Sequence, residues 1–170
     1  MQRLMLIIAS IIVTIIFALQ GFAPKYTMPT ADELKAGEVR TVGDPETALS
    51  EIYFDVSILG VEEVTPQKLE EEFGIDPFIY TYCGGRYTNG RYGIADVILL
   101  YPRSGYEDEV REALQTIKLS RINLFKNYDI YNSHDLAENG TIARRGGYYI
   151  LTMIDNEEAV WDILEEYIPR

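Results

Sequence analysis

The sequence predicts an α+β domain, with an antiparallel sheet of about four strands in two hairpins covered on one face by amphipathic helices. Apolar residues recur at intervals of three and four in the segments before residue 74, from 106 to 128 and after 157, which is a helical period. The segments 78–101 and 141–154 are instead rich in β-branched and aromatic residues, with glycines between paired runs. The resulting order, helix, helix, two strands, long helix, two strands, helix, is typical of this class.

An apolar segment precedes this domain. Leu4 to Leu19 contains no charged residue, and its sixteen residues form a helix of about 24 Å, against about 30 Å for a bilayer core. The length therefore lies between that of a secretory leader and that of a full span. A cut after Ala23 would place Pro24 next to the scissile bond, which hinders cleavage. The sequence favours a transmembrane signal anchor over residues 1–23, and a removed signal peptide is the alternative.

The distribution of charge indicates how the chain is oriented in the membrane and which class of partner it excludes. Arg3 and the amino terminus precede the apolar run, whereas Asp32 and Glu33 follow Lys25, so the C-terminal part is expected outside the cytoplasm. From residue 25 onward, 14 Lys and Arg face 27 Asp and Glu, a net charge of −13. Such a surface repels nucleic acid. We expect a single-pass protein of the cell membrane with an extracytoplasmic domain.

Residues 24–44 have the prolines, glycines and scattered charge of a linker, so the domain is expected at 45–170. Asp44-Pro45 and Thr65-Pro66 each combine an N-cap residue with a proline at the first helical position, and they predict two helix starts. Phe73-Gly74 predicts the end of the second helix, because glycine readily takes the left-handed conformation found there.

The remaining elements follow from period and turn residues. Runs 78–82 and 94–101 predict a hairpin joined by a glycine-rich loop, and runs 141–144 and 148–154 predict a second hairpin around Gly146-Gly147. Ser104 with Glu107 and Asp155 with Glu158 have the spacing of capping boxes, which predict the starts of the long helix and the last helix. The stretch 129–139 between them is polar.

The segment LEEEFGIDP at 69–77, the two strand pairs, the long helix and the segment GGYYILTMID at 146–155 resemble a bacterial family. The family is domain of unknown function 4358, found mostly in Firmicutes on secreted lipoproteins and membrane-anchored proteins, and the resemblance covers about residues 46 to 168. It implies an extracytoplasmic location in a Gram-positive bacterium. It implies no activity and no catalytic residues. This chain lacks the lipidation cysteine after its apolar run, which favours a protein anchor.

Cys83 and His134 are the only thiol and the only imidazole, so a nucleophilic site of this type would need both. Asp135 or Asp155 would orient the imidazole ring. However, Cys83 lies at a predicted strand end, and His134 lies in a polar stretch typical of a surface loop or helix start. One histidine and one cysteine without a spaced cluster do not supply a zinc site. We expect no metal and no cofactor.

The most unusual local composition is the segment 84–93, which holds four glycines, two arginines and two tyrosines in an acidic chain. Arginine binds carboxylate or phosphate in a bidentate manner, and tyrosine offers an apolar face with a hydroxyl. The second hairpin repeats this composition at 144–149. If the hairpins lie side by side, one end of the sheet carries the candidate ligand site, formed by Arg86, Tyr87, Arg91, Tyr92, Arg144 and Arg145. The alternative is that the glycines form turns and that the arginines protect sheet edges or pair with the abundant acidic residues of the domain.

These observations favour a membrane-anchored, extracytoplasmic, non-enzymatic binding or interaction module of the bacterial cell envelope. The arginine site would recognise an anionic group on a wall polymer, a peptide or an envelope protein. Two alternatives from other classes stay open. One is a thiol-dependent hydrolase or transferase that uses Cys83 and His134, and the other is a structural subunit of a larger assembly.

Overall fold

The computed structural model describes residues 43–170. The predicted anchor over residues 1–23 and nearly all of the predicted linker lie outside the described residues. Among those residues, no helix has both the length and the apolar character that crossing a membrane requires.

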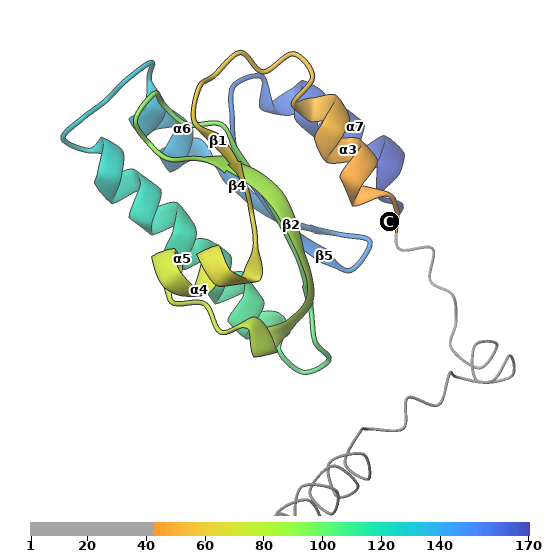
Figure 1. Ribbon diagram of the computed structural model, residues 1–170. Helices are drawn as coiled ribbons and strands as arrows, with labels where there is room; N and C mark the ends of the chain where they lie inside the picture. Colours follow the sequence, from red (N-terminus) through yellow and green to blue (C-terminus); the bar gives the residue numbers. More distant parts are fainter. Residues whose placement is uncertain (1–42) are drawn as a thin grey trace, which may run out of the picture. The chain divides into compact units, whose positions relative to one another are not determined.

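The described residues form one antiparallel sheet and helices on both of its faces (Figure 1). The strands are β1 (Val61–Glu63), β2 (Tyr80–Thr88), β3 (Asp96–Pro102), β4 (Thr141–Arg145) and β5 (Tyr148–Met153). The helices are α3 (Pro45–Ile52), α4 (Pro66–Phe73), α5 (Glu107–Phe125), α6 (Ser133–Asn139) and α7 (Glu157–Tyr167). The predicted α+β class and the antiparallel sheet are confirmed.

The sheet has five strands in the order β1-β2-β3-β5-β4, and every neighbouring pair is antiparallel. The two predicted hairpins are present and are formed by β2 with β3 and by β4 with β5. The prediction of four strands missed β1, because its three residues, Val61, Glu62 and Glu63, are too few and too acidic to show a strand pattern. The first predicted strand also begins late, since Pro77–Ile79 forms a 3-10 turn before β2.

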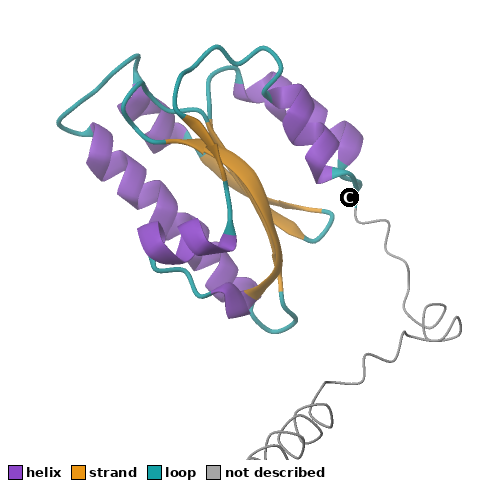
Figure 2. Ribbon diagram, viewed as in Figure 1, coloured by secondary structure: helices purple, strands orange, loops and turns teal. Residues whose placement is uncertain are grey.

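Helices cover both faces of the sheet, so the prediction that they lie on one face is wrong (Figure 2). Helices α4, α5 and α6 pack on one face, around Ile98, Leu100 and Leu151. Helices α3 and α7 pack on the other, around Val97, Leu99 and Ile150. The cause is visible in β3, where Val97 to Leu100 are all fully buried. A strand that is apolar without alternation is buried on both faces.

Two helix starts and one helix end form as predicted. Asp44 accepts a hydrogen bond from the Thr47 N–H (3.0 Å), and Thr65 accepts one from the Lys68 N–H (3.3 Å). Gly74 ends α4 with φ of 67°. These interactions are local, so the sequence is sufficient to predict them.

The two predicted capping boxes do not form. Helix α5 starts at Glu107 with Tyr106 at the N-cap, and Glu107 Oε2 accepts from the Gly105 N–H (3.0 Å). Helix α7 starts at Glu157, with Asn156 at the N-cap in the left-handed conformation. The polar stretch 129–139, described above as typical of a surface loop or helix start around His134, contains α6.

Candidate functional site

The predicted glycine-rich loop at 84–93 is largely strand. Gly84 to Thr88 belong to β2, and the connection to β3 starts only at Asn89. Gly85 pairs with Ile98, and a Cβ atom at this position would lie 2.3 Å from the carbonyl oxygen of Val97. The glycine therefore permits close approach of two strands, a role that the sequence does not distinguish from that of a turn.

Tyr87 is not available to a ligand, because its side chain is only 2% exposed. Its hydroxyl donates to Glu72 Oε1 (2.6 Å), and the charged groups of Lys68 and Arg121 lie 5.3 and 5.2 Å from its ring centroid. Burial, assisted by the hydrogen bond to Glu72, raises the pKa of Tyr87 to about 12. Tyr87 thus serves the packing between β2, α4 and α5.

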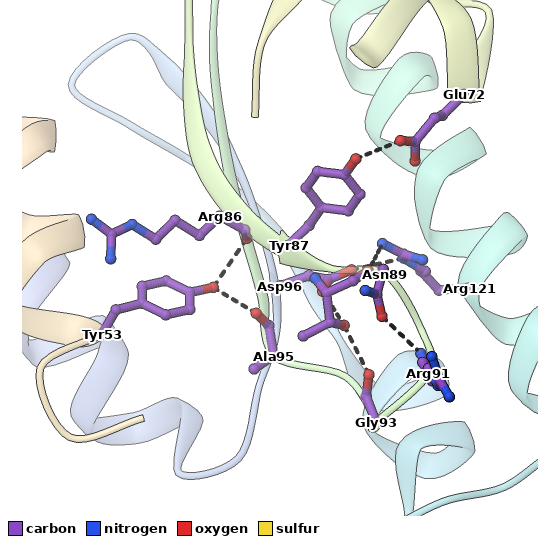
Figure 3. A network of polar contacts seen from close by, with 11 residues as sticks. Tyr53, Glu72, Arg86, Tyr87, Asn89, Arg91, Gly93, Ala95, Asp96 and Arg121 are labelled. Carbon is purple, nitrogen blue, oxygen red and sulfur yellow. Dashed lines mark hydrogen bonds and ion pairs between the residues drawn. The ribbon is translucent and has the colours of Figure 1, made fainter. Parts of the chain in front are cut away.

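A buried ionic network lies beside Tyr87 (Figure 3). Arg121 of α5 donates through Nε to Asp96 Oδ2 (2.8 Å) and through Nη2 to the Thr88 carbonyl (2.6 Å). The Thr88 N–H donates to Asp96 Oδ1 (2.8 Å). Asp96 is fully buried, and burial raises its pKa, while Arg121 and the hydrogen bonds from Thr88 act in the opposite direction.

The sequence contains two signals of this network, although its motifs and spacing do not reveal the pairing. Asp96 is the single charge in the apolar run 94–101, and Arg121 lies on the buried stripe of α5 between Ile117 and Phe125. A charge at an otherwise apolar position is normally paired when it is buried. The network joins the turn end of the β2–β3 hairpin to α5, and the charged groups of Asp96 and Arg121 find their hydrogen-bond partners within it. It is therefore a structural element.

The two arginines of the first hairpin lie apart, because Arg86 is in β2 and points toward Tyr53, whereas Arg91 is in the connection between β2 and β3 (Figure 3). Arg86 packs over the Tyr53 ring, with 5.4 Å between its guanidinium carbon and the ring centroid, and it is half-buried. The Tyr53 hydroxyl donates to the Ala95 carbonyl (2.6 Å), which holds α3 against the strand. Arg91 is exposed beside Tyr92, at 5.5 Å.

The second pair of arginines lies at the opposite end of the sheet. Arg86 is level with Val97 and Thr152, whereas Arg144 is level with Tyr149 and Leu100. Because β3 and β5 are antiparallel, the turns of the two hairpins point in opposite directions. The expectation that four arginines line one end of the sheet is therefore wrong, and the structure divides the candidate residues into two separate groups.

Arg145 stabilises the C-terminal end of α7. Its Nε donates to the Ile168 carbonyl (2.5 Å), its Nη2 donates to the Glu165 carbonyl (3.0 Å), and its Nη1 lies 3.1 Å from Glu165 Oε1. The last carbonyl groups of a helix need such donors, and a positive charge there interacts favourably with the helix dipole. This arginine is thus engaged within the protein.

A hollow of about 620 Å³ lies beside it, between the β4–β5 turn and α7. Its lining includes Arg144, Arg145, Trp161, Glu165 and Arg170. Arg144 and Arg170 are exposed, and the guanidinium of Arg144 lies 5.6 Å from the ring centroid of Tyr149. Trp161 is half-buried, and its Nε1 donates to Glu157 (3.3 Å). We call this group of five residues the hairpin pocket.

A family model described as Domain of unknown function (DUF4358) matches residues 55–154. The chain belongs to this family. The resemblance described above is thereby confirmed, over a shorter stretch that begins after α3 and ends before α7. No curated protein and no solved structure matches the chain.

In this DUF4358 domain, Cys83 and His134 do not form the nucleophile–base pair considered above. Cys83 is in the middle of β2, level with Leu100, and packs against the core. His134 is in α6, whose first residue Ser133 lies against Gly93 in the connection between β2 and β3. Burial raises the pKa of the Cys83 thiol, which disfavours the reactive thiolate.

Within residues 43–170, one group of side chains has the proximity that a metal ion requires. Ligand atoms of His134, Asp135 and Glu138 all lie within 4.8 Å of one another. Both carboxylates are exposed, and all three residues belong to the short helix α6. Residues three and four apart on one helix turn are close in any case, so this proximity alone does not define a metal site.

Proposed function

We propose that the chain is a membrane-anchored, extracytoplasmic binding module of the cell envelope without catalytic activity, and that it recognises an anionic group in the hairpin pocket. The apolar run before Ala23 and the charges on either side of it support the anchor and the orientation. The charge of −13 after residue 24 supports a partner other than nucleic acid.

The observation that carries this proposal is the charge of the hairpin pocket. Three of its lining residues are arginines and one is a glutamate, in a domain that is otherwise strongly acidic. Arg145 and Glu165 neutralise each other, so Arg144 and Arg170 supply the charge that a ligand would meet. Guanidinium groups bind phosphate and carboxylate in a bidentate manner, and the ring of Trp161 supplies a flat apolar wall.

Substitution of Arg144 and Arg170 tests this site while leaving Arg145 to hold α7. We expect the full-length R144Q/R170Q variant, in zwitterionic lipid nanodiscs, to bind pyrophosphate or an oligoglutamate peptide at least tenfold more weakly than the unchanged protein. Hydrogen bonds to charged groups contribute about 1.5 to 3 kcal/mol each, so the loss of two is sufficient. Arg111→Gln is the matched control, since Arg111 is exposed on α5.

The titration also distinguishes a phosphate ligand from a carboxylate ligand. Tighter binding of pyrophosphate by the unchanged protein would indicate a phosphate, and tighter binding of the oligoglutamate peptide would indicate a carboxylate. Equal binding of both probes by R144Q/R170Q and the unchanged protein would refute the site.

The proposed extracytoplasmic location has its own test. Protease added to intact cells should degrade the domain only if it is extracytoplasmic, and a protected domain would contradict the orientation.

A further inference from the structure

A second hollow, of about 840 Å³, lies at the other end of the sheet, near the β2–β3 connection. It is formed by residues 51–59 of α3 and the following loop, residues 92–95, the turn 131–132 with Leu136 of α6, and residues 154–163 at the start of α7. We call it the acidic groove. None of its residues belongs to the hairpin pocket, so it is independent of the function proposed above.

We propose that the acidic groove binds an apolar segment of a partner protein that carries lysine or arginine side chains. The floor is suited to the apolar part of such a segment. Ile52, Ile94, Ile154 and Val160 line it and are buried, and half-buried aliphatic side chains continue it toward the rim. Apolar hollows of a few hundred Å³ are typical of binding sites.

The rim extends this apolar surface outward. Leu59 is 66% exposed and Tyr131 is 84% exposed, and both line the groove together with Tyr92. Large exposed apolar side chains grouped around a hollow are typical of protein interaction surfaces. A small molecule inside the hollow would leave these side chains in water, whereas a polypeptide segment that passes over the rim would cover them. The shape therefore favours a protein segment.

Charge specifies which segment fits. The charged residues that line the groove are Glu51, Asp55 and Asp155, and all three are acidic. A basic segment would be complementary to them, and the net negative charge of the domain would accelerate its approach. A second copy of this chain would bring the same acidic rim against itself, so complementarity argues against a symmetric dimer at this surface.

The backbone around the groove has an uncommon conformation. Among the described residues, Tyr131, Asn132 and Asn156 are the non-glycine residues with positive φ, at 49°, 61° and 55°, and all three line the groove. Such conformations persist where the surrounding structure imposes them, and they concentrate at ligand-binding sites. Here they place the Tyr131 ring at the rim and start α7 beside the floor. This second observation supports the same surface.

Site-specific photo-crosslinking of the full-length protein in its native envelope tests the proposal. A photoreactive phenylalanine derivative replaces Ala159, inside the groove, or Leu59, at its rim. The control position is Leu119, which is 49% exposed on α5. We expect mass spectrometry to map the cross-links from positions 159 and 59 to one segment of another protein. That segment should be apolar with a net positive charge, and it should not be labelled from position 119.

Charge reversal then tests the complementarity. We expect D55K/D155K to reduce the cross-linking yield from position 159 at least fivefold. Asp55 and Asp155 are exposed, so the variant should stay folded, with a small loss of melting temperature because Asp155 accepts from the Asn156 N–H at the start of α7. The matched control E70K/E112K reverses two exposed charges on α4 and α5 and should leave the yield unchanged. Cross-links to a second copy, to lipid or to an acidic segment would overturn the proposal. An absence of cross-links at both groove positions, or a yield insensitive to D55K/D155K, would overturn it equally.

Discussion

The buried pair of Asp96 and Arg121 allows a quantitative prediction, because its two members respond differently to substitution. Arg121→Met leaves a buried carboxylate without its cation, and Asp96→Asn leaves a buried guanidinium without its anion. Breaking a buried pair by removing one partner costs about 3 to 5 kcal/mol of unfolding free energy. We expect each single variant to lose stability within this range at pH 8.

The double variant D96N/R121M removes both charges. It should be more stable than the sum of the two single effects predicts, with a coupling free energy of at least about 2 kcal/mol, because no unpaired charge stays buried. The amide introduced at position 96 retains a carbonyl oxygen that can accept from the Thr88 N–H, which preserves one contact of the network.

The pH dependence separates the two single variants. Burial already raises the pKa of Asp96, and the loss of Arg121 removes the main opposing influence. In R121M the folded state therefore binds the proton more tightly than the unfolded chain, and stability relative to the unchanged protein rises as the pH falls from 8 to 5. Each pH unit below the pKa of this carboxyl in the folded variant reduces the cost by about 1.4 kcal/mol, until Asp96 of the folded unchanged protein, whose pKa is also raised, becomes protonated in turn.

The stability cost of Asp96→Asn should not fall between pH 8 and pH 5, because arginine stays charged over this range. Urea unfolding followed through the fluorescence of Trp161, the single tryptophan, measures all four proteins at both pH values. Arg111→Met is the control. Arg111 pairs with Asp108 on the exposed surface of α5, so its loss should change stability by less than about 0.5 kcal/mol. An equal cost of R121M at pH 5 and pH 8, or additive single effects, would refute the reasoning.

Two further predictions concern β2. Gly85→Ala should destabilise the protein by more than about 2 kcal/mol in the same urea assay, because the new Cβ meets the Val97 carbonyl oxygen and the residue has a φ of 143°. The control Gly74→Ala should cost only about 1 kcal/mol, since Gly74 has a φ of 67° but open space around it. Equal costs of the two substitutions would contradict this reasoning. Iodoacetamide should alkylate Cys83 more slowly at pH 8 in the folded protein than in urea, since burial raises the pKa of its thiol; a faster reaction when folded would instead support an activated cysteine.

The features that the sequence predicted correctly depend on residues close together in the chain. The caps at Asp44 and Thr65 bond to an N–H three residues on, and Gly74 ends its helix by its own conformation. The buried positions of α5 from Val110 to Ile117 follow from a helical period that a short window displays. The second hairpin around Gly146-Gly147 is likewise a local turn between two short strands.

Other features depend on contacts between distant segments, and local pattern could not decide them. Glycine is favoured both in turns and where two strands approach closely, and the sequence does not distinguish these uses. The pattern therefore predicts a loop at Gly84 and Gly85, although β2 continues through them. The partner of Asp96 is 25 residues away in α5, a separation that no spacing rule covers. The face on which α7 packs depends on the burial of β3 on both sides.

The candidate site shows the same division. The sequence alone determined which residues carry unusual chemistry: clustered arginines and tyrosines in an acidic chain, and one thiol with one imidazole. Only the tertiary structure decided which of them meet, because the antiparallel pairing of β3 with β5 directs the two hairpin turns to opposite ends of the sheet. It also decided that Tyr87 is buried and that the acidic groove exists at all, since its walls come from four segments spread over more than a hundred residues of sequence.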